Sequence, residues 1–160
     1  MLRAPVLYLE TSVFGFFADE EPRNLVHSEA VRALFQQIEL GILDGITSRV
    51  TADELGDAPA ELREGLLRLL ALVRVPSLDE VEVARLAARY VKDGIIPAQY
   101  IVDAQHVACA TLARADVLVS MNLKHIANEW SARRVNAVNM AEGYPLISVR
   151  TPMEVLRYET

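Results

Sequence analysis

The stretch Val6-Leu7-Tyr8-Leu9-Glu10-Thr11-Ser12 opens with four apolar residues and breaks off at an acid. A short, uninterrupted apolar run of this kind is typical of a strand that is buried on both faces. Val117-Leu118-Val119-Ser120-Met121-Asn122 repeats the pattern, with Asn122 as the polar interruption. Strands buried on both faces occur in parallel sheets that helices cover on each side. The two runs therefore predict strands at 6–10 and 117–121 of an α/β fold.

Elsewhere, apolar residues recur at helical spacing between shorter apolar runs. We expect helices at 24–37, 59–72, 80–91, 103–115 and 123–130, a short helix carrying Glu54, and a helical turn at 153–158. Further strands are expected at 42–48, 73–75 and 147–149, whereas the segment after Arg134 gives no clear pattern. The alternation predicts a three-layer α/β/α fold with a central parallel sheet, formed by residues 1–160 as one domain.

Composition narrows the classes of protein to consider. No apolar stretch approaches the roughly 20 residues that span a bilayer, and the N-terminal segment lacks the pattern of a signal peptide, so we expect a soluble, cytoplasmic protein. The single Cys109 cannot form an internal disulfide. A net charge of −6 argues against nucleic-acid binding through a generally basic surface. It leaves open a local acidic site where bound divalent cations reverse the field.

Four polar residues interrupt or border apolar segments: Glu10, Glu54, Asp103 and Asn122. Ligands of parallel α/β sheets bind at the carboxyl ends of the strands, where Glu10 and Asn122 are expected. Oxygen ligands of this kind suit Mg²⁺, which keeps several waters and takes substrate phosphate oxygens. Structural explanations compete for three of the residues. Asp103 and Asn122 are natural helix caps, and Glu54 fits an exposed helix position, whereas Glu10 needs a partner if it is buried.

Other site chemistries find less support in the sequence. The chain has no Gly-x-Gly-x-x-Gly or Walker loop, and Ser12 and Ser120 lie outside any Gly-x-Ser-x-Gly elbow. His27, His106 and His125 lack the spacing of a zinc site. We expect His106, within an apolar helix, to be a hydrogen-bonded packing residue.

Taken together, four segments resemble the PIN-domain ribonucleases, in particular the VapC-type toxins of toxin–antitoxin pairs. The segments are Val6 to Val13, Thr51 to Leu55, Asp103 to Ala108, and Leu118 to Asn122. The resemblance implies a parallel sheet between helices and an acidic pocket that binds Mg²⁺, or Mn²⁺ in its place, to cleave RNA.

The resemblance also assigns roles to the polar residues. Glu10 stands where the family usually has its first aspartate, Glu54 matches the family glutamate, and Asp103 matches the acid that opens the central helix. These three carboxylates are the implied metal ligands, with Glu54 supporting through water. Asn122 stands where many members have a further aspartate. It keeps an oxygen ligand but lacks the charge, which weakens binding of a second ion, and it is expected to orient a water.

The implied activity is a metal-dependent endoribonuclease with an RNA substrate, a homodimeric state and an antitoxin partner. Candidate phosphate contacts are Thr11, Ser12, Ser120, Lys124, Arg49 and the pair Arg133-Arg134. Two alternatives stay open. The altered Glu10 and Asn122 fit a PIN-like binding module that acts through a protein partner and has weakened catalysis. The second alternative is a small-molecule α/β enzyme such as a phosphatase.

Overall fold

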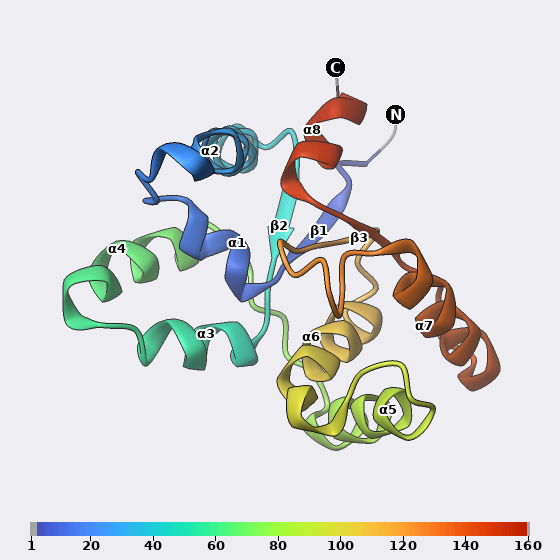
Figure 1. Cartoon of the computed structure of the whole chain (residues 1–160). Helices are drawn as coiled ribbons and strands as arrows, with labels where there is room; N and C mark the ends of the chain where they lie inside the picture. The colour runs from blue at the N-terminus through green and yellow to red at the C-terminus, as the bar shows by residue number, and fades with distance from the viewer. Residues whose placement is uncertain (1–2, 160) are drawn as a thin grey trace.

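The computed structural model describes residues 3–159 and the side chains as far as residue 157. Four strands form one all-parallel sheet in the order β2-β1-β3-β4. They are β1 (Val6–Leu9), β2 (Asp44–Ile46), β3 (Val117–Val119) and β4 (Ser148–Arg150). Leu7 of β1 is paired with Gly45 on one side and with Val117 on the other. The expected parallel sheet and α/β fold are confirmed (Figure 1).

Helices separate the strands along the chain. The α-helices are α1 (Thr11–Phe16), α2 (Leu25–Glu39), α3 (Arg49–Gly56), α4 (Ala60–Leu70), α5 (Glu80–Lys92), α6 (Ile101–Leu112), α7 (Glu129–Glu142) and α8 (Pro152–Glu159). Two short 3₁₀ helices, η1 (Pro22–Asn24) and η2 (Ala98–Tyr100), precede α2 and α6. In the described residues 3–159, no helix is both long and apolar enough to cross a membrane.

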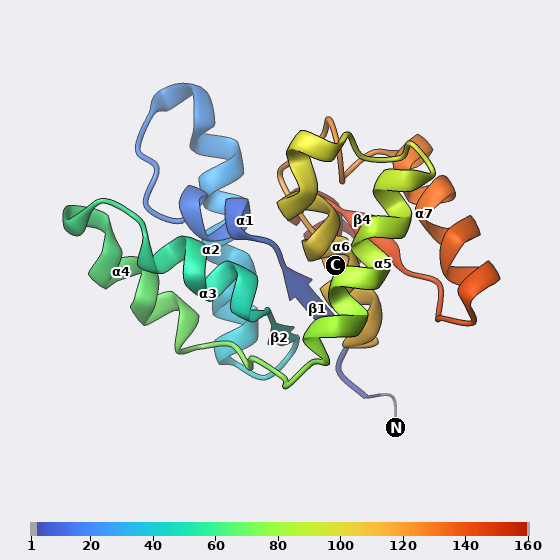
Figure 2. The ribbon, with the colours of Figure 1, turned by 90° about the horizontal axis from the view of Figure 1, so that it is seen from below.

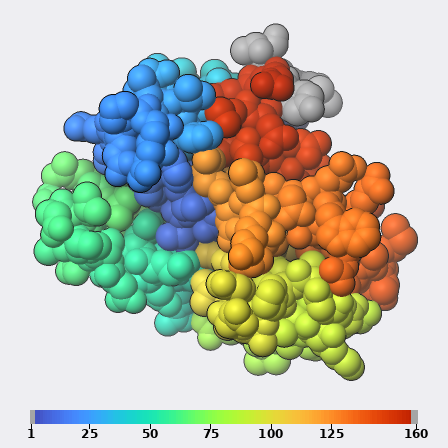
Figure 3. Space-filling view, in the orientation of Figure 1, coloured from blue at the N-terminus to red at the C-terminus, as the bar shows by residue number. Residues whose placement is uncertain are grey.

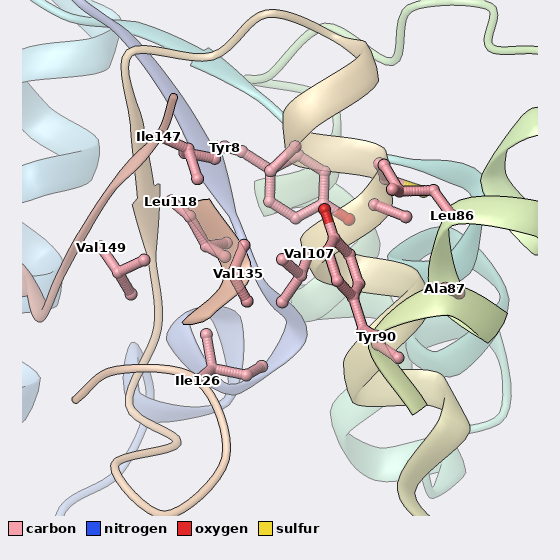
Figure 4. Close-up of a cluster of buried hydrophobic side chains, with 14 of the residues drawn as sticks. Tyr8, Leu86, Ala87, Tyr90, Val107, Leu118, Ile126, Val135, Ile147 and Val149 are labelled. Atoms are coloured by element: carbon pink, nitrogen blue, oxygen red, sulfur yellow. The ribbon is translucent and has the colours of Figure 1, made fainter. Parts of the chain in front are cut away.

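The pleat of β1 divides the core into two clusters, one on each face of the sheet. Leu7 and Leu9 pack on the side of α1, α2 and α8, together with Val119. Tyr8 points to the other face, where it packs with Leu118 and residues of α5, α6 and α7 (Figure 4). Figure 2 shows α5, α6 and α7 on one side of the strands and α2 on the other. A sheet covered in this way is a three-layer α/β/α sandwich.

The helix expected at 123–130 is wrong, and a long helix fills the segment that gave no clear pattern. Residues 123–128 form turns instead of a helix, and α7 begins only at Glu129. Asn128 is extended, and its side chain accepts a hydrogen bond from the N–H of Ser131, so it caps the helix at this point. The helix continues to Glu142, through the segment that showed no clear pattern. It ends before Gly143, whose φ of 80° suits a residue without a Cβ.

Two further differences concern the elements next to the sheet. Residues 73–75 form only one isolated bridge, from Arg74 to Ile46, where a strand was expected. The strand at 6–10 ends one residue early because Glu10 caps α1, a short helix that the sequence pattern did not predict.

The strand order places a topological switch at the centre of the sheet. From β1 the chain crosses to β2 on one side, and the later strands β3 and β4 lie on the other side of β1. Ligand sites of open parallel sheets lie outside the carboxyl ends of the strands that flank such a switch. Glu10 directly follows β1, and Ser120 directly follows β3.

Candidate active site at the carboxyl edge of the sheet

The predicted site residues come from segments that meet at one edge of the sheet. Figure 3 shows part of this face, with the dark blue chain that follows β1 next to the orange segment that follows β3. Glu10, Thr11 and Ser12 belong to the first segment, and Ser120 and Asn122 to the second. The bonds between them are tight enough to define a connected polar network.

Glu10 lies at the centre of this network and is only 6% exposed. Its Oε2 accepts from the N–H of Ser12, and its Oε1 accepts from the hydroxyls of Ser12 at 2.5 Å and Ser120 at 2.6 Å. The hydroxyl of Ser12 accepts from the N–H of Met121, and that of Ser120 accepts from the N–H of Asn122. The hydrogen of each hydroxyl therefore points to the carboxylate. The carboxylate also lies at the N-terminus of α1, where the helix dipole favours negative charge.

The same network continues from Ser120 to Asp103. The side-chain amide of Asn122 donates to Oδ2 of Asp103 at 3.1 Å, and its Oδ1 accepts from the N–H of His125. Nδ1 of His125 lies 3.2 Å from the same Oδ2. Asn122 thus fixes the turn after β3 and also holds Asp103. Glu10 and Asp103, 93 positions apart in the sequence, are joined through Ser120 and Asn122.

Asp103 does not cap its helix. It is the third residue of α6, whose N-cap position is Tyr100, and Tyr100 makes no side-chain capping bond. The structural explanation by capping is therefore wrong for Asp103. Asn122 caps no helix either, although it does stabilise the turn that replaces the expected one.

Glu54 lies on α3 with 41% of its side chain exposed, as the sequence indicated, and it belongs to a second group of hydrogen bonds. Its Oε1 accepts from the hydroxyl of Thr11 at 2.6 Å and lies 2.7 Å from Nε2 of His106. Burial alone would raise the pKa of Glu54, but the bonds from His106 and Thr11 outweigh it and hold the pKa below its usual value. Glu54 is therefore an ionised, fixed carboxylate and not a free surface acid.

A buried chain of hydrogen bonds lies behind Glu54. The hydroxyl of Tyr8 is 2.9 Å from Nδ1 of His106 and 2.6 Å from the hydroxyl of Ser48. An ionised carboxylate only accepts, so Nε2 of His106 carries the proton that is donated to Glu54, and Nδ1 accepts from Tyr8. Burial raises the pKa of Tyr8 strongly, which keeps its hydroxyl protonated for this role. His106 is hydrogen-bonded and buried, as the sequence indicated.

Carboxylate oxygens are the ligands that a hard cation such as Mg²⁺ takes in proteins. Among the residues that the structure describes, no group of three His, Cys, Asp or Glu side chains is placed to hold a metal ion. Mg²⁺ typically needs only one or two carboxylates and completes its shell with water and phosphate. Within residues 3–157, Glu10 has no Lys or Arg partner, and Oδ1 of Asp103 and Oε2 of Glu54 accept no hydrogen bond. These free oxygen lone pairs are what such an ion requires.

Among the candidate phosphate contacts, the cations differ in availability. Arg49 forms an ion pair with Glu80, and Arg133 forms one with Glu129. Arg134 donates to the carbonyl of Asp93. Lys124 is exposed, and its ammonium has no partner in the described part of the chain. Lys124 is therefore the cation most available to a phosphate near Asp103.

Four network residues were not predicted as part of the site: Tyr8, Ser48, His106 and His125. His106 gave a signal, since it lies three residues after Asp103 and shares a face of the helix with it. A cavity of about 560 Å³ lies elsewhere, between α3, α5 and α6. It contains Ser48 and Cys109 in its wall but none of the three carboxylates.

No protein-family model matches the chain, and no curated protein matches it significantly.

Proposed function

We propose that this protein is a metal-dependent endoribonuclease of PIN-like type. One observation carries the proposal: the buried carboxylate of Glu10 lies at the switch point of the sheet, has no Lys or Arg partner within residues 3–157, and is joined to Asp103 through Ser120 and Asn122. Burial of an ionised carboxylate is costly unless its charge is compensated. A divalent cation shared by Glu10 and Asp103 supplies that compensation.

When bound, Mg²⁺ or Mn²⁺ would activate a water and stabilise charge on the phosphate. The chain's own residues position the reaction. Glu10 and Asp103 are the direct ligands, and Glu54, fixed by Thr11 and His106, holds the water shell. Asn122 keeps Asp103 in place with one amide hydrogen, and Lys124 contacts a phosphate of the RNA.

The bonds already made by the hydroxyls change one earlier expectation. Ser12 and Ser120 each donate to Glu10, so their hydrogens are committed to the acid. The same holds for Thr11, which donates to Glu54. These three hydroxyls therefore act by positioning the carboxylates, and phosphate binding is left to the metal and Lys124.

The resemblance adds proposals about context. We infer a cytoplasmic protein that forms a homodimer and pairs with an antitoxin whose tail covers the acidic pocket. Light scattering on the purified chain tests the dimer. Co-purification with the product of a neighbouring gene tests the antitoxin.

The decisive assay for the function is RNA cleavage by the purified protein with and without metal. We expect scission of single-stranded or structured RNA with Mg²⁺ or Mn²⁺, and its loss in EDTA. Glu10→Gln and Asp103→Asn should each abolish it. Asp53→Asn is the matched control, because this neighbouring acid on α3 is exposed and its carboxylate has no partner among residues 3–157. Full activity in EDTA, or in both site variants, would defeat the proposal.

The same assay separates the alternatives. A small-molecule phosphatase would hydrolyse phosphate monoesters and leave RNA intact. A binding module would retain RNA or protein binding in all variants and show no metal-dependent scission.

A further inference from the structure

The start of α6 brings an aromatic ring close to the candidate metal site. Tyr100 lies three residues before Asp103, at the end of η2. Its ring lies on that of His125, with 4.1 Å between the centroids and 34° between the planes. His125 in turn contacts Oδ2 of Asp103. One imidazole ring therefore separates the ring of Tyr100 from a proposed metal ligand. Figure 2 shows the orange segment after β3 next to the yellow start of α6.

The ring of Tyr100 is held in place but not covered. His125 supports one face, yet Tyr100 remains 38% exposed, whereas Tyr8 and Tyr90 are completely buried. An aromatic ring that a neighbouring ring holds in place, and that keeps much of its surface exposed, offers a stacking surface at little cost in conformational entropy. Unpaired bases of RNA stack on such rings, whatever their sequence.

We propose that Tyr100 stacks against an unpaired base of the RNA next to the scissile phosphate. The inference rests on the proposed ribonuclease function and names the substrate class more closely. Charge favours this occupant over a protein segment, since the unpaired ammonium of Lys124 adjoins His125 in the chain and suits a phosphate. A base in a duplex cannot leave its stack without cost, so the site selects single-stranded or looped RNA.

Two variants of Tyr100 separate the effect of the aromatic ring from that of the hydroxyl. Tyr100→Phe keeps the stacking face and removes only the hydroxyl, which makes no hydrogen bond within the described residues. Tyr100→Leu keeps an apolar side chain and removes the ring. We expect the enzyme concentration that gives half-maximal single-turnover cleavage to rise about 5-fold or more in Tyr100→Leu, in line with the known contribution of base stacking. Tyr100→Phe should match the wild type.

A complementary experiment removes the base from the RNA instead of the ring from the protein. An abasic nucleotide is moved, one position at a time, along a short single-stranded RNA on both sides of the cleaved bond. At one position next to that bond it should weaken the wild type as much as Tyr100→Leu does. The two changes together should cost no more than either alone, because both remove the same contact.

The outcomes are distinct. Cleavage by the wild type with equal behaviour of Tyr100→Leu, or additive effects of the ring and the abasic position, overturns the stacking while the ribonuclease function stands. An equal loss for every RNA, abasic or not, also overturns it and points to a structural role of the ring. If the wild type cleaves no RNA, the proposed function fails, and the stacking falls with it.

Discussion

The hydroxyl of Tyr8 offers the sharpest test of the buried network, because Tyr8→Phe removes one oxygen atom and keeps the ring. That hydroxyl is bonded to Ser48 at 2.6 Å and to Nδ1 of His106 at 2.9 Å, in a region that solvent does not reach. The variant leaves Nδ1 of His106 buried without a donor. An unsatisfied buried polar group costs about 1–3 kcal/mol. For a chain of this length the melting temperature should fall by roughly 2–12 °C.

Urea unfolding followed by circular dichroism measures this loss. We expect a lower midpoint with an unchanged slope, because the surface exposed on unfolding stays the same. Tyr90→Phe is the control. The hydroxyl of Tyr90 is equally buried and donates to Asn139 at 2.5 Å, but it is not connected to the candidate site. Both variants should lose stability, whereas only Tyr8→Phe should slow RNA cleavage, because only Tyr8 holds His106 against Glu54. A free energy of unfolding within about 0.5 kcal/mol of the wild type for Tyr8→Phe would refute the reasoning.

Two further predictions concern the sheet and its surroundings. In Gly45→Ala the new Cβ would lie 2.8 Å from Cδ1 of Ile38, so we expect urea unfolding to show a free energy of unfolding about 1–3 kcal/mol lower. Gly56→Ala is the control, because its Cβ would meet no atom within 4 Å and its stability should not fall. An unfolding midpoint of Gly45→Ala equal to that of the wild type would contradict the packing. Hydrogen bonds from Arg3 lower the pKa of Asp116, although burial partly opposes them. The carboxylate of Asp116 therefore stabilises the fold fully above its unfolded pKa of about 4, and this contribution is lost as the pH falls through the lower folded pKa. The stability gap between wild type and Asp116→Asn should therefore shrink from pH 6 to pH 3, and a gap that stays constant would argue against this ion pair.

The two central strands, β1 and β3, could be predicted because they are unbroken apolar runs. The outer strands gave a weaker signal, since β2 contains Asp44 and Gly45 and β4 begins at the exposed Ser148. The sequence was not sufficient for α7, where few apolar residues mark a face. Asn128 caps that helix and so sets where it begins. The helix predicted at 123–130 does not form, and Asn122 stabilises the turn found there instead. Short polar residues that cap turns and helices alike are ambiguous without three-dimensional context.

The candidate site could likewise be predicted only in part. The positions of Glu10 and Asn122 followed from the strand ends, since parallel strands place their carboxyl ends at one edge. The contact between Tyr8 and His106 could not be predicted, because the two residues are 98 positions apart and Tyr8 is indistinguishable in the sequence from any other core residue. The capping of α1 by Glu10 was also missed, and it gives this acid a structural role in addition to the proposed one.

The most direct measurement of the central claim is a crystal structure of the protein soaked with Mn²⁺, with the ion located by its anomalous scattering. We expect one ion bound to carboxylate oxygens of Glu10 and Asp103, with Glu54 reached through water. Full occupancy of Mn²⁺ elsewhere, with the carboxylate of Glu10 keeping its bonds to Ser12 and Ser120 and binding no ion, would contradict the claim.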